Sequence, residues 1–134
     1  MIFGIGTDIL RSDRVAATYA RFGQRFVDRL LMPEELALFG RAPDPVRFLA
    51  MRFAAKEAIV KAMGTGFAHG MWIRDAGVVH DPKGRPLIIY SPRGQQLCAA
   101  LGIGAGHLSL SDEAGLVVAM AVLLRAGPAD SPRG

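Results

Sequence analysis

The stretch RFAAKEAIVKAMGTG, residues 52–66, predicts most of a long helix and its end. Alanine and other good helix formers fill it, and Gly64 and Gly66 follow where helices commonly stop. Working outward from this stretch, we expect the helix to begin near Val46 and to end at Met63. Its predicted core-facing stripe recurs at steps of three and four residues. The stripe consists of Phe48, Met51, Ala55, Ile59 and Ala62.

Two charged residues of this helix, Glu57 and Lys61, are one turn apart and lie roughly opposite the apolar stripe. Ala50 and Ala54 are small neighbours that we expect to leave room for a ligand. One interpretation is a surface ion pair that contributes about 0.3 kcal/mol. The other is half of a site for a metal ion and a phosphate, in which the glycines after the helix let the backbone approach an anion.

The rest of the chain predicts strands and shorter helices around the long helix. The stretch IFGIGTDIL at 2–10 is expected to be a strand whose Gly4 and Gly6 let another backbone lie close. The pattern predicts one α+β domain over residues 1–125 and a disordered tail at 126–134. Further strands are expected at 71–81, 87–90, 107–111 and 116–124, and further helices at 12–30, with a break near Gly23, at 32–39 and at 92–101.

Composition bounds the class of protein. The 134 residues suffice for one compact domain, and 51% of them are hydrophobic, which is enough for a buried core. A single cysteine, Cys98, excludes an internal disulfide and fits a reducing compartment. The first ten residues have no basic segment and carry Asp8, so no signal peptide is expected. The longest apolar run, 116–124, is too short to span a membrane, and we expect a cytoplasmic protein.

The formal net charge of +4 favours an acidic partner or a phosphate-bearing ligand. The densest basic stretch is 11–29, where Arg14, Arg21 and Arg25 share a helical face beside the expected core stripe. Such arginines are usually only solvated, but their density here points to an acidic partner. A small RNA-binding domain would need exposed aromatic side chains beside the arginines. The nearby aromatics fall on the core stripe instead, so nucleic acid is not an expected partner.

Asp8, near the end of the first expected strand, supplies a second carboxylate. Two carboxylates on separate rigid elements suit Mg²⁺ when substrate phosphates and water complete its coordination, and Lys61 would neutralise phosphate charge. An aspartate at such a place is more often a turn or cap residue. No G-x-x-x-x-G-K-[ST] loop, no H-E-x-x-H motif and no full dinucleotide fingerprint is present. The remaining hypothesis is a magnesium and phosphate site built from Asp8, Glu57 and Lys61.

Three blocks of sequence, in this order and spacing, carry a family resemblance: GIGTDI at 4–9, RFAAKEAIVKAMGTG at 52–66 and HLSLSDEAGLVVAMAVL at 107–123. Together they resemble the holo-acyl carrier protein synthases, the small 4′-phosphopantetheinyl transferases, over nearly the whole chain. The resemblance implies an α+β fold with an antiparallel sheet packed against the long helix. It also implies transfer of 4′-phosphopantetheine from coenzyme A to a serine of acyl carrier protein, in the service of fatty acid biosynthesis.

The same resemblance implies roles for individual residues. Mg²⁺, with Mn²⁺ as an alternative ion, would be held by Asp8 and Glu57, which form the catalytic set with Lys61. A homotrimer with active sites at the subunit interfaces is implied, in which His107 and Ser109 act from the adjacent subunit. The implied contacts with the acidic carrier protein are Arg14, Arg21 and Arg25, and those with coenzyme A are Arg52, Lys61, Gly64, Gly66, Pro86, His107 and Ser109.

Two questions stay open at this level. Asp112, followed by Glu113, stands where many relatives carry a histidine, so no role is assigned to this pair. The base that takes the serine proton is Glu57, a metal-bound water or a carboxylate of the 112–113 turn. The alternative function is a non-catalytic module that binds carrier protein or nucleotide. Such a module would be marked by the loss of a catalytic residue, and all three are present.

Overall fold

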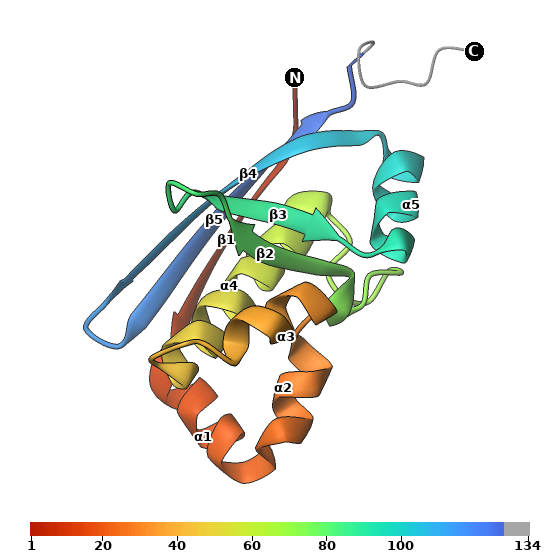
Figure 1. Ribbon diagram of the computed structural model, residues 1–134. Coiled ribbons are helices and arrows are strands. Elements are labelled where there is room, and N and C mark those ends of the chain that lie inside the picture. Colours follow the sequence, from red (N-terminus) through yellow and green to blue (C-terminus); the bar gives the residue numbers. More distant parts are fainter. Residues whose placement is uncertain (128–134) are drawn as a thin grey trace.

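The computed structural model describes residues 1–127, in which helices and strands combine into the expected α+β fold (Figure 1). The strands are β1 (Ile2–Arg11), β2 (Ala76–His80), β3 (Pro86–Tyr90), β4 (Ile103–Glu113) and β5 (Leu116–Arg125). The helices are α1 (Ser12–Phe22), α2 (Gln24–Leu30), α3 (Pro33–Phe39), α4 (Pro45–Met63) and α5 (Pro92–Leu101), with a 3-10 turn, η1 (Ile73–Asp75), before β2. None of the helices within residues 1–127 has the length and apolar character that crossing a membrane requires.

The chain beyond β5 was predicted to be a disordered tail at 126–134. Ala126 and Gly127 follow β5 without helix or strand structure. Residues 128–134 lie outside the described residues, so the prediction for them stays a prediction.

Strands β1, β5 and β4 form an antiparallel sheet in that order, and β2 pairs with β3 in a separate hairpin. Residues directly opposite each other in such a sheet point to the same face. The register therefore defines an inner face, which α4 covers in Figure 1, and an outer face. One row of the inner face is Asp8, Ala119 and Leu110, and the neighbouring row of the outer face is Thr7, Met120 and Ser109.

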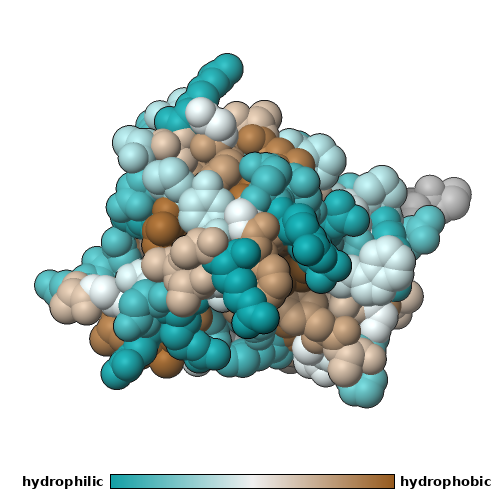
Figure 2. All heavy atoms as spheres, turned by 90° about the horizontal axis from the view of Figure 1, so that it is seen from below, coloured by the Kyte–Doolittle hydropathy of each residue, from teal (hydrophilic) through white to brown (hydrophobic). Residues whose placement is uncertain are grey.

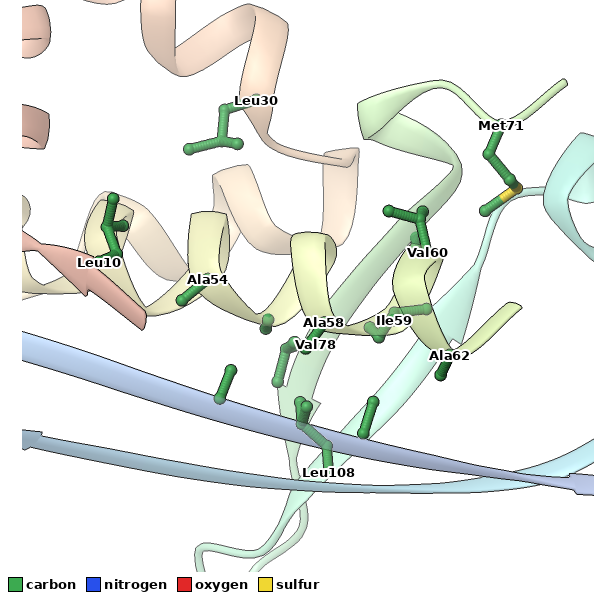
Figure 3. Packing of buried hydrophobic residues seen from close by; sticks show 14 of the residues in the cluster. Leu10, Leu30, Ala54, Ala58, Ile59, Val60, Ala62, Met71, Val78 and Leu108 are labelled. Atoms are coloured by element: carbon green, nitrogen blue, oxygen red, sulfur yellow. The ribbon is translucent and has the colours of Figure 1, made fainter. Parts of the chain in front are cut away.

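Helix α4 lies directly against β1 because the residues at the contact are small. A Cβ on Gly4 would lie 1.9 Å from the carbonyl oxygen of Ala62, and one on Gly6 would lie 2.0 Å from that of Ala58. Neither position has space for a side chain, so the predicted close approach of another backbone is confirmed. Figure 3 shows Ala54, Ala58 and Ala62 on the side of α4 that faces the strands.

The burial of α4 extends around most of its circumference, which corrects the narrow stripe predicted from the sequence. Phe48 and Met51 of that stripe are only partly buried. Ala50 and Ala54, which were expected to leave room for a ligand, have no exposed surface. The helix contacts the sheet, α1, α2 and β2, so apolar residues are needed on several sides and the protein's own core takes the space.

Local signals explain where the elements end. The Asp44 side chain caps α4 by accepting the N–H of Arg47 at 3.1 Å, and Gly64 ends the helix in the left-handed conformation, with φ of 78°. The β4–β5 hairpin turns through Ala114 and Gly115, both with positive φ, as a two-residue turn of this twist requires.

The strand expected at 71–81 is wrong in its first half. Ile73–Asp75 form η1, and the strand begins only at Ala76. The Asp75 carboxylate accepts the backbone N–H of Trp72 at 2.8 Å, which closes the chain into a turn before it can extend. An aspartate inside a run of apolar residues was the available signal for this turn.

A buried ion pair joins α3, α4 and β2. The ammonium of Lys56 lies 2.6 Å from a carboxylate oxygen of Glu35, and neither side chain has exposed surface. Glu35 also accepts the backbone N–H groups of Met32 and Val78, each at 3.0 Å, and Lys56 donates to the carbonyl of Ala76. Burial lowers the pKa of Lys56, and the charge of Glu35 opposes that shift. The pair is stabilised by hydrogen bonds on every side.

Candidate active site

Asp8, Glu57 and Lys61 come together where β1 passes along α4. The Lys61 ammonium donates to Oδ1 of Asp8 at 3.2 Å and to the carbonyl of Thr7 at 3.1 Å. The Asp8 side chain is 16% exposed and that of Lys61 is 51% exposed, so the pair lies at the surface with the carboxylate set back. Lys61 therefore pairs across two elements, which the helical spacing of Glu57 and Lys61 does not predict.

The pKa of Glu57 reflects its burial and the nearby carboxylate of Asp8. Burial raises the pKa of Glu57, the negative charge of Asp8 raises it further, and Lys61 acts in the opposite direction. Two carboxylates are thus held close together, and Lys61 offsets part of their charge. Such an arrangement stabilises a second cation and is common at functional sites.

A cavity of about 380 Å³ opens beside these carboxylates. Asp8 and Glu57 line it together with Arg14 of α1 and the aromatic ring of Phe53. Its wall continues along α1 to a second hollow of about 210 Å³, because Thr18 and Phe26 line both. A partner that occupies the second hollow would therefore lie next to the two carboxylates.

The donor set of the cavity suits a hard divalent cation. Within residues 1–127 no group of three or more His, Cys, Asp or Glu side chains is placed to hold a metal. Mg²⁺ needs fewer protein ligands, because it is usually bound by one or two carboxylates together with substrate phosphates and water. Asp8 and Glu57 fit this requirement, and the mutual effect of their charges favours the ion.

Gly64 and Gly66 lie at the end of α4, one turn beyond Lys61. The backbone N–H of Gly64 donates to the carbonyl of Lys61 at 3.1 Å, and those of Thr65 and Gly66 both donate to the carbonyl of Val60 at 3.2 Å. These three amide groups are therefore already used to close the helix. The two glycines leave space for an anion to approach, but their own N–H groups point into the helix end.

His107 and Ser109 lie on the outer face of the sheet, away from Asp8. Their partners in β5 are Val122 and Met120, whereas Asp8 pairs with a residue of the inner face. The sheet itself separates them from the Asp8 of the same chain. The two residues meet an Asp8–Glu57 pair only if that pair belongs to another copy of the chain.

Arg52 and Pro86 lie beside a different cavity. Arg52 precedes Glu57 by five residues, which places it about 140° around the axis of α4 from Glu57. Its guanidinium stacks on the ring of Phe48 at 4.0 Å and is almost fully buried. Pro86 pairs with His80 across the β2–β3 hairpin, and His80 lines the same cavity of about 150 Å³ as Arg52. Its three basic lining side chains are Arg47, Arg52 and His80.

Asp112 is engaged by its own chain. Both of its carboxylate oxygens accept hydrogen bonds from the guanidinium of Arg47, at 2.9 and 3.0 Å, and these bonds lower the pKa of Asp112. In the register of the sheet Asp8 aligns with Leu110, so Asp112 lies two residues further along β4. The strand spacing puts its backbone about 12 Å from that of Asp8. Asp112 fixes the hairpin to α4 and does not reach the cavity of its own chain.

The predicted carrier face carries Arg14, Arg21 and Arg25, all exposed on α1 and α2. The guanidinium of Arg21 lies 4.9 Å from the ring centre of Phe22, which is 44% exposed. The expectation that the aromatics beside the arginines all fall on the core stripe is wrong at Phe22, because α1 ends there and the chain turns at a glycine. Figure 2 views this end of the molecule, where hydrophilic groups surround hydrophobic ones.

The buried pair of Lys56 and Glu35 is the feature that the sequence analysis missed. Lys56 directly precedes Glu57 in α4, so the fixed end of its side chain helps to set the rotation of the helix. One signal was available, since Lys56 directly follows two alanines in a helix that is otherwise mostly apolar. Its partner lies 21 positions earlier, a distance at which periodicity gives no information.

Comparison with known proteins gives a consistent result. A sequence model of the 4′-phosphopantetheinyl transferase superfamily matches residues 4–121. A holo-[acyl-carrier-protein] synthase of Neisseria meningitidis serogroup A is 46% identical over 122 residues, which are 91% of this chain and 98% of that protein. The crystal structure of a synthase from Neisseria meningitidis has a TM-score of 0.90 at 44% identity and covers 93% of this chain and 100% of its own. A Helicobacter pylori synthase in complex with coenzyme A has a TM-score of 0.78 at 31% identity, over 89% and 98% of the two chains.

Proposed function

The chain belongs to the 4′-phosphopantetheinyl transferase superfamily, and on this premise we propose which of its residues carry out the reaction. It is an enzyme of the holo-[acyl-carrier-protein] synthase type. It transfers the 4′-phosphopantetheine group of coenzyme A to a serine of apo-acyl carrier protein and releases adenosine 3′,5′-bisphosphate. The observation that carries the site is that Asp8 and Glu57 line one cavity while Lys61 bonds to Asp8.

The first part of the proposal concerns the metal. Asp8 and Glu57 would hold Mg²⁺, or Mn²⁺ in its place, together with the diphosphate of coenzyme A. When bound, the ion supplies positive charge to the diphosphate oxygens. The support is the raised pKa of Glu57, which reflects burial and a second negative charge nearby. Lys61 is half exposed and adds a further positive charge that can turn from Asp8 toward a phosphate.

The second part concerns the transfer itself. The serine oxygen of the carrier attacks the phosphorus that bears the pantetheine, and the bond from that phosphorus to the bridging oxygen breaks. Among the chain's own carboxylates Glu57 is best placed to take the serine proton, because it lines the cavity. Asp112 is a poorer base, since Arg47 holds it ionised and away from the cavity.

The third part concerns assembly. A homotrimer would bring His107 and Ser109 of one copy to the Asp8 and Glu57 of the next, and so complete a site that the sheet divides within one chain. The exposed apolar side chains of the outer face support such a contact, because their burial against another copy would be favourable. These side chains are Ile5, Ile9, Leu116, Val118 and Met120.

Coenzyme A would then contact residues from two copies. Lys61, Gly64 and Gly66 would border the diphosphate side, whereas Arg52 lines the cavity at the β2–β3 hairpin and Pro86 pairs with His80 of its lining. A nucleotide phosphate in that cavity would meet Arg47, Arg52 and His80, with Asp44 as an acidic neighbour. The Nε of Arg52 faces the carboxylate of Glu35 at 3.6 Å, so Glu35 offsets part of the charge of Arg52 within the chain.

The carrier protein would dock on the face of α1 and α2 that carries Arg14, Arg21 and Arg25. Arg14 lines the first of the two connected hollows that lead to the carboxylates, and Arg25 lines the second. Nucleic acid is not proposed as a partner, because Phe22 stacks with Arg21 of its own helix. We place the protein in the cytoplasm, since its single cysteine fits a reducing compartment. Its transfer reaction would serve fatty acid biosynthesis.

Mass spectrometry of the carrier protein tests the proposed residues. The enzyme, coenzyme A, Mg²⁺ and apo-carrier protein should yield the phosphopantetheine adduct, EDTA should stop the reaction, and Mg²⁺ should restore it. Lys61→Ala should lose transfer while Arg125→Ala, a matched exposed cation at the end of β5, should keep it. Full transfer in metal-free buffer would refute the metal assignment. A folded parent enzyme without any transfer would favour the non-catalytic binding module.

A further inference from the structure

Trp72 is the single tryptophan of the chain, and 62% of its surface is exposed. Tryptophan has the largest apolar surface of any side chain and is highly buried on average. Trp72 precedes η1 and takes no part in the catalytic cavity or in the hydrophobic core. Its exposed ring is therefore available to a partner outside the folded chain.

The Trp72 backbone is held rigidly. Its N–H donates to Oδ2 of Asp75 at 2.8 Å, and the other oxygen of Asp75 accepts the hydroxyl of Ser91 at 2.7 Å. Burial alone would raise the pKa of Asp75, but these bonds and the guanidinium of Arg93 lower it. Asp75 thus stays ionised and joins η1 to the start of α5.

The Trp72 side chain is also ordered in the free protein. The guanidinium of Arg93 lies 3.9 Å from the centre of the indole ring, and it is held in place by an ion pair with Asp75. The close packing of α5 makes this possible, since a Cβ on Gly94 would lie 2.4 Å from the carbonyl oxygen of Asp75. An aromatic ring and a guanidinium that are ordered before binding lose little side-chain entropy on binding.

This exposed pair adjoins the carrier face. Helix α2 contacts η1, and the guanidinium of Arg74 donates to the carbonyl oxygen of Asp28 at 3.4 Å. Arg29, the next residue, is exposed and lines the hollow between α1 and α2 together with Arg25. Exposed arginines therefore continue from the proposed carrier face onto η1 and the start of α5, with Asp28 as an acidic residue at the junction. These segments lie next to one another in Figure 1.

We propose that Trp72, Arg74 and Arg93 form a docking platform for the acidic carrier protein, next to the arginine face of α1 and α2. The inference rests on the proposed function, because it takes its partner from there. Three arguments favour this partner: the positive charge, the continuity with the carrier face, and the residue types, since tryptophan and arginine dominate the residues on which protein binding depends. The carrier would cover the exposed indole while its carboxylates pair with Arg74 and Arg93.

The single tryptophan makes a direct test possible. Emission from Trp72 should shift to shorter wavelength and saturate as apo-carrier protein that lacks tryptophan is added, in the presence of adenosine 3′,5′-bisphosphate and Mg²⁺. Coenzyme A alone should leave the emission unchanged. Because the Asp75 bond uses the backbone of Trp72, the variant Trp72→Ala keeps this bond and should fold normally.

Kinetics complete the test. Trp72→Ala should raise the KM for carrier protein roughly fivefold or more, with kcat and the KM for coenzyme A unchanged, and Trp72→Phe should recover part of the loss. Arg74→Gln should also raise the KM for carrier, whereas Arg125→Gln, which removes the same charge at the end of β5, should not. Unchanged emission and an unchanged KM in an active enzyme would refute the platform alone. An inactive parent enzyme would refute the proposed function.

Discussion

Replacing Glu57 by glutamine should make the metal-free protein more stable and the enzyme much slower. Glu57 is partly buried beside Asp8, so its charge costs free energy in the absence of a cation. Because the site is half open to water, the effect is that of a screened pair of like charges, about 0.5 kcal/mol. For a domain of this size that corresponds to a rise of about 1.5 °C in the melting temperature.

The sign of the effect follows from the pKa. The folded state raises the pKa of Glu57 above its unfolded value of about 4.3, so the folded state binds this proton more tightly. The parent therefore loses stability as the pH rises through the interval between the two values and does not regain it above. The advantage of Glu57→Gln should be fully present at neutral pH, and should vanish below about pH 4.

A bound divalent cation should reverse this order and make the parent more stable than Glu57→Gln. Ligand at about 100 times its dissociation constant adds about 2.7 kcal/mol to the stability of the folded state, or roughly 8 °C here. In Mg²⁺ with adenosine 3′,5′-bisphosphate the parent should gain most of this amount, and Glu57→Gln should gain much less because one of the two proposed carboxylate ligands has lost its charge. The transfer rate should fall on the order of a hundredfold or more.

Thermal melting in EDTA and in Mg²⁺ with nucleotide, combined with the transfer rate, checks all three expectations. Glu34→Gln is the matched control, since it removes an exposed carboxylate at the start of α3. It should respond to Mg²⁺ as the parent does and keep the parental rate. If Glu57→Gln melted below the parent in EDTA, or gained as much from Mg²⁺ as the parent, the two-carboxylate site would be refuted.

Three further outcomes are expected. Charge reversal at Arg14, Arg21 and Arg25 should weaken carrier binding at low salt, with little effect on coenzyme A affinity, and titration calorimetry at two salt concentrations checks this. Met120→Glu, on the exposed outer face, should leave the chain folded but monomeric and inactive, and light scattering of an active monomer would contradict the divided site. Lys56→Met should lower the free energy of unfolding by about 3 kcal/mol or more, because it leaves Glu35 unpaired in the core. Lys61→Ala should change the free energy of unfolding by less than about 0.5 kcal/mol. Denaturant titration of both variants measures this difference between the two lysines.

Those parts of the fold that depend on neighbouring residues could be predicted from the sequence. The start of α5 behind Ser91, the break at Gly23 and the close approach at Gly4 and Gly6 each follow from one residue type at one place. The Asp8, Glu57 and Lys61 set was also predicted, although its ion pair joins Lys61 to Asp8. This difference arises because helical spacing describes neighbours on one element, whereas the packing of β1 on α4 decides which charges meet.

The buried residues show the opposite case. Lys56 and Arg52 lie on the same helix as Glu57 and are chemically suited to bind anions, yet Lys56 is fully enclosed and Arg52 nearly so. What distinguishes them from Lys61 is Glu35, which α3 brings to them from far along the chain. A local sequence pattern does not span the separation between Glu35 and these two residues, so only the folded structure shows that Glu35 pairs with them.

The proposed division of the site between two copies depends on the register of one hairpin. Ala114 and Gly115 make a two-residue turn, and this turn sets Ser109 opposite Met120, which in turn lies opposite Thr7. Side chains alternate along a strand, so a shift of β4 by one residue would move His107 and Ser109 to the inner face, on the side of Asp8. The length of the turn thus determines whether His107 and Ser109 lie on the same face as the Asp8 of their own chain or can contact only the Asp8 of another copy. An insertion of one residue in the turn is therefore expected to abolish transfer even where each named side chain is retained.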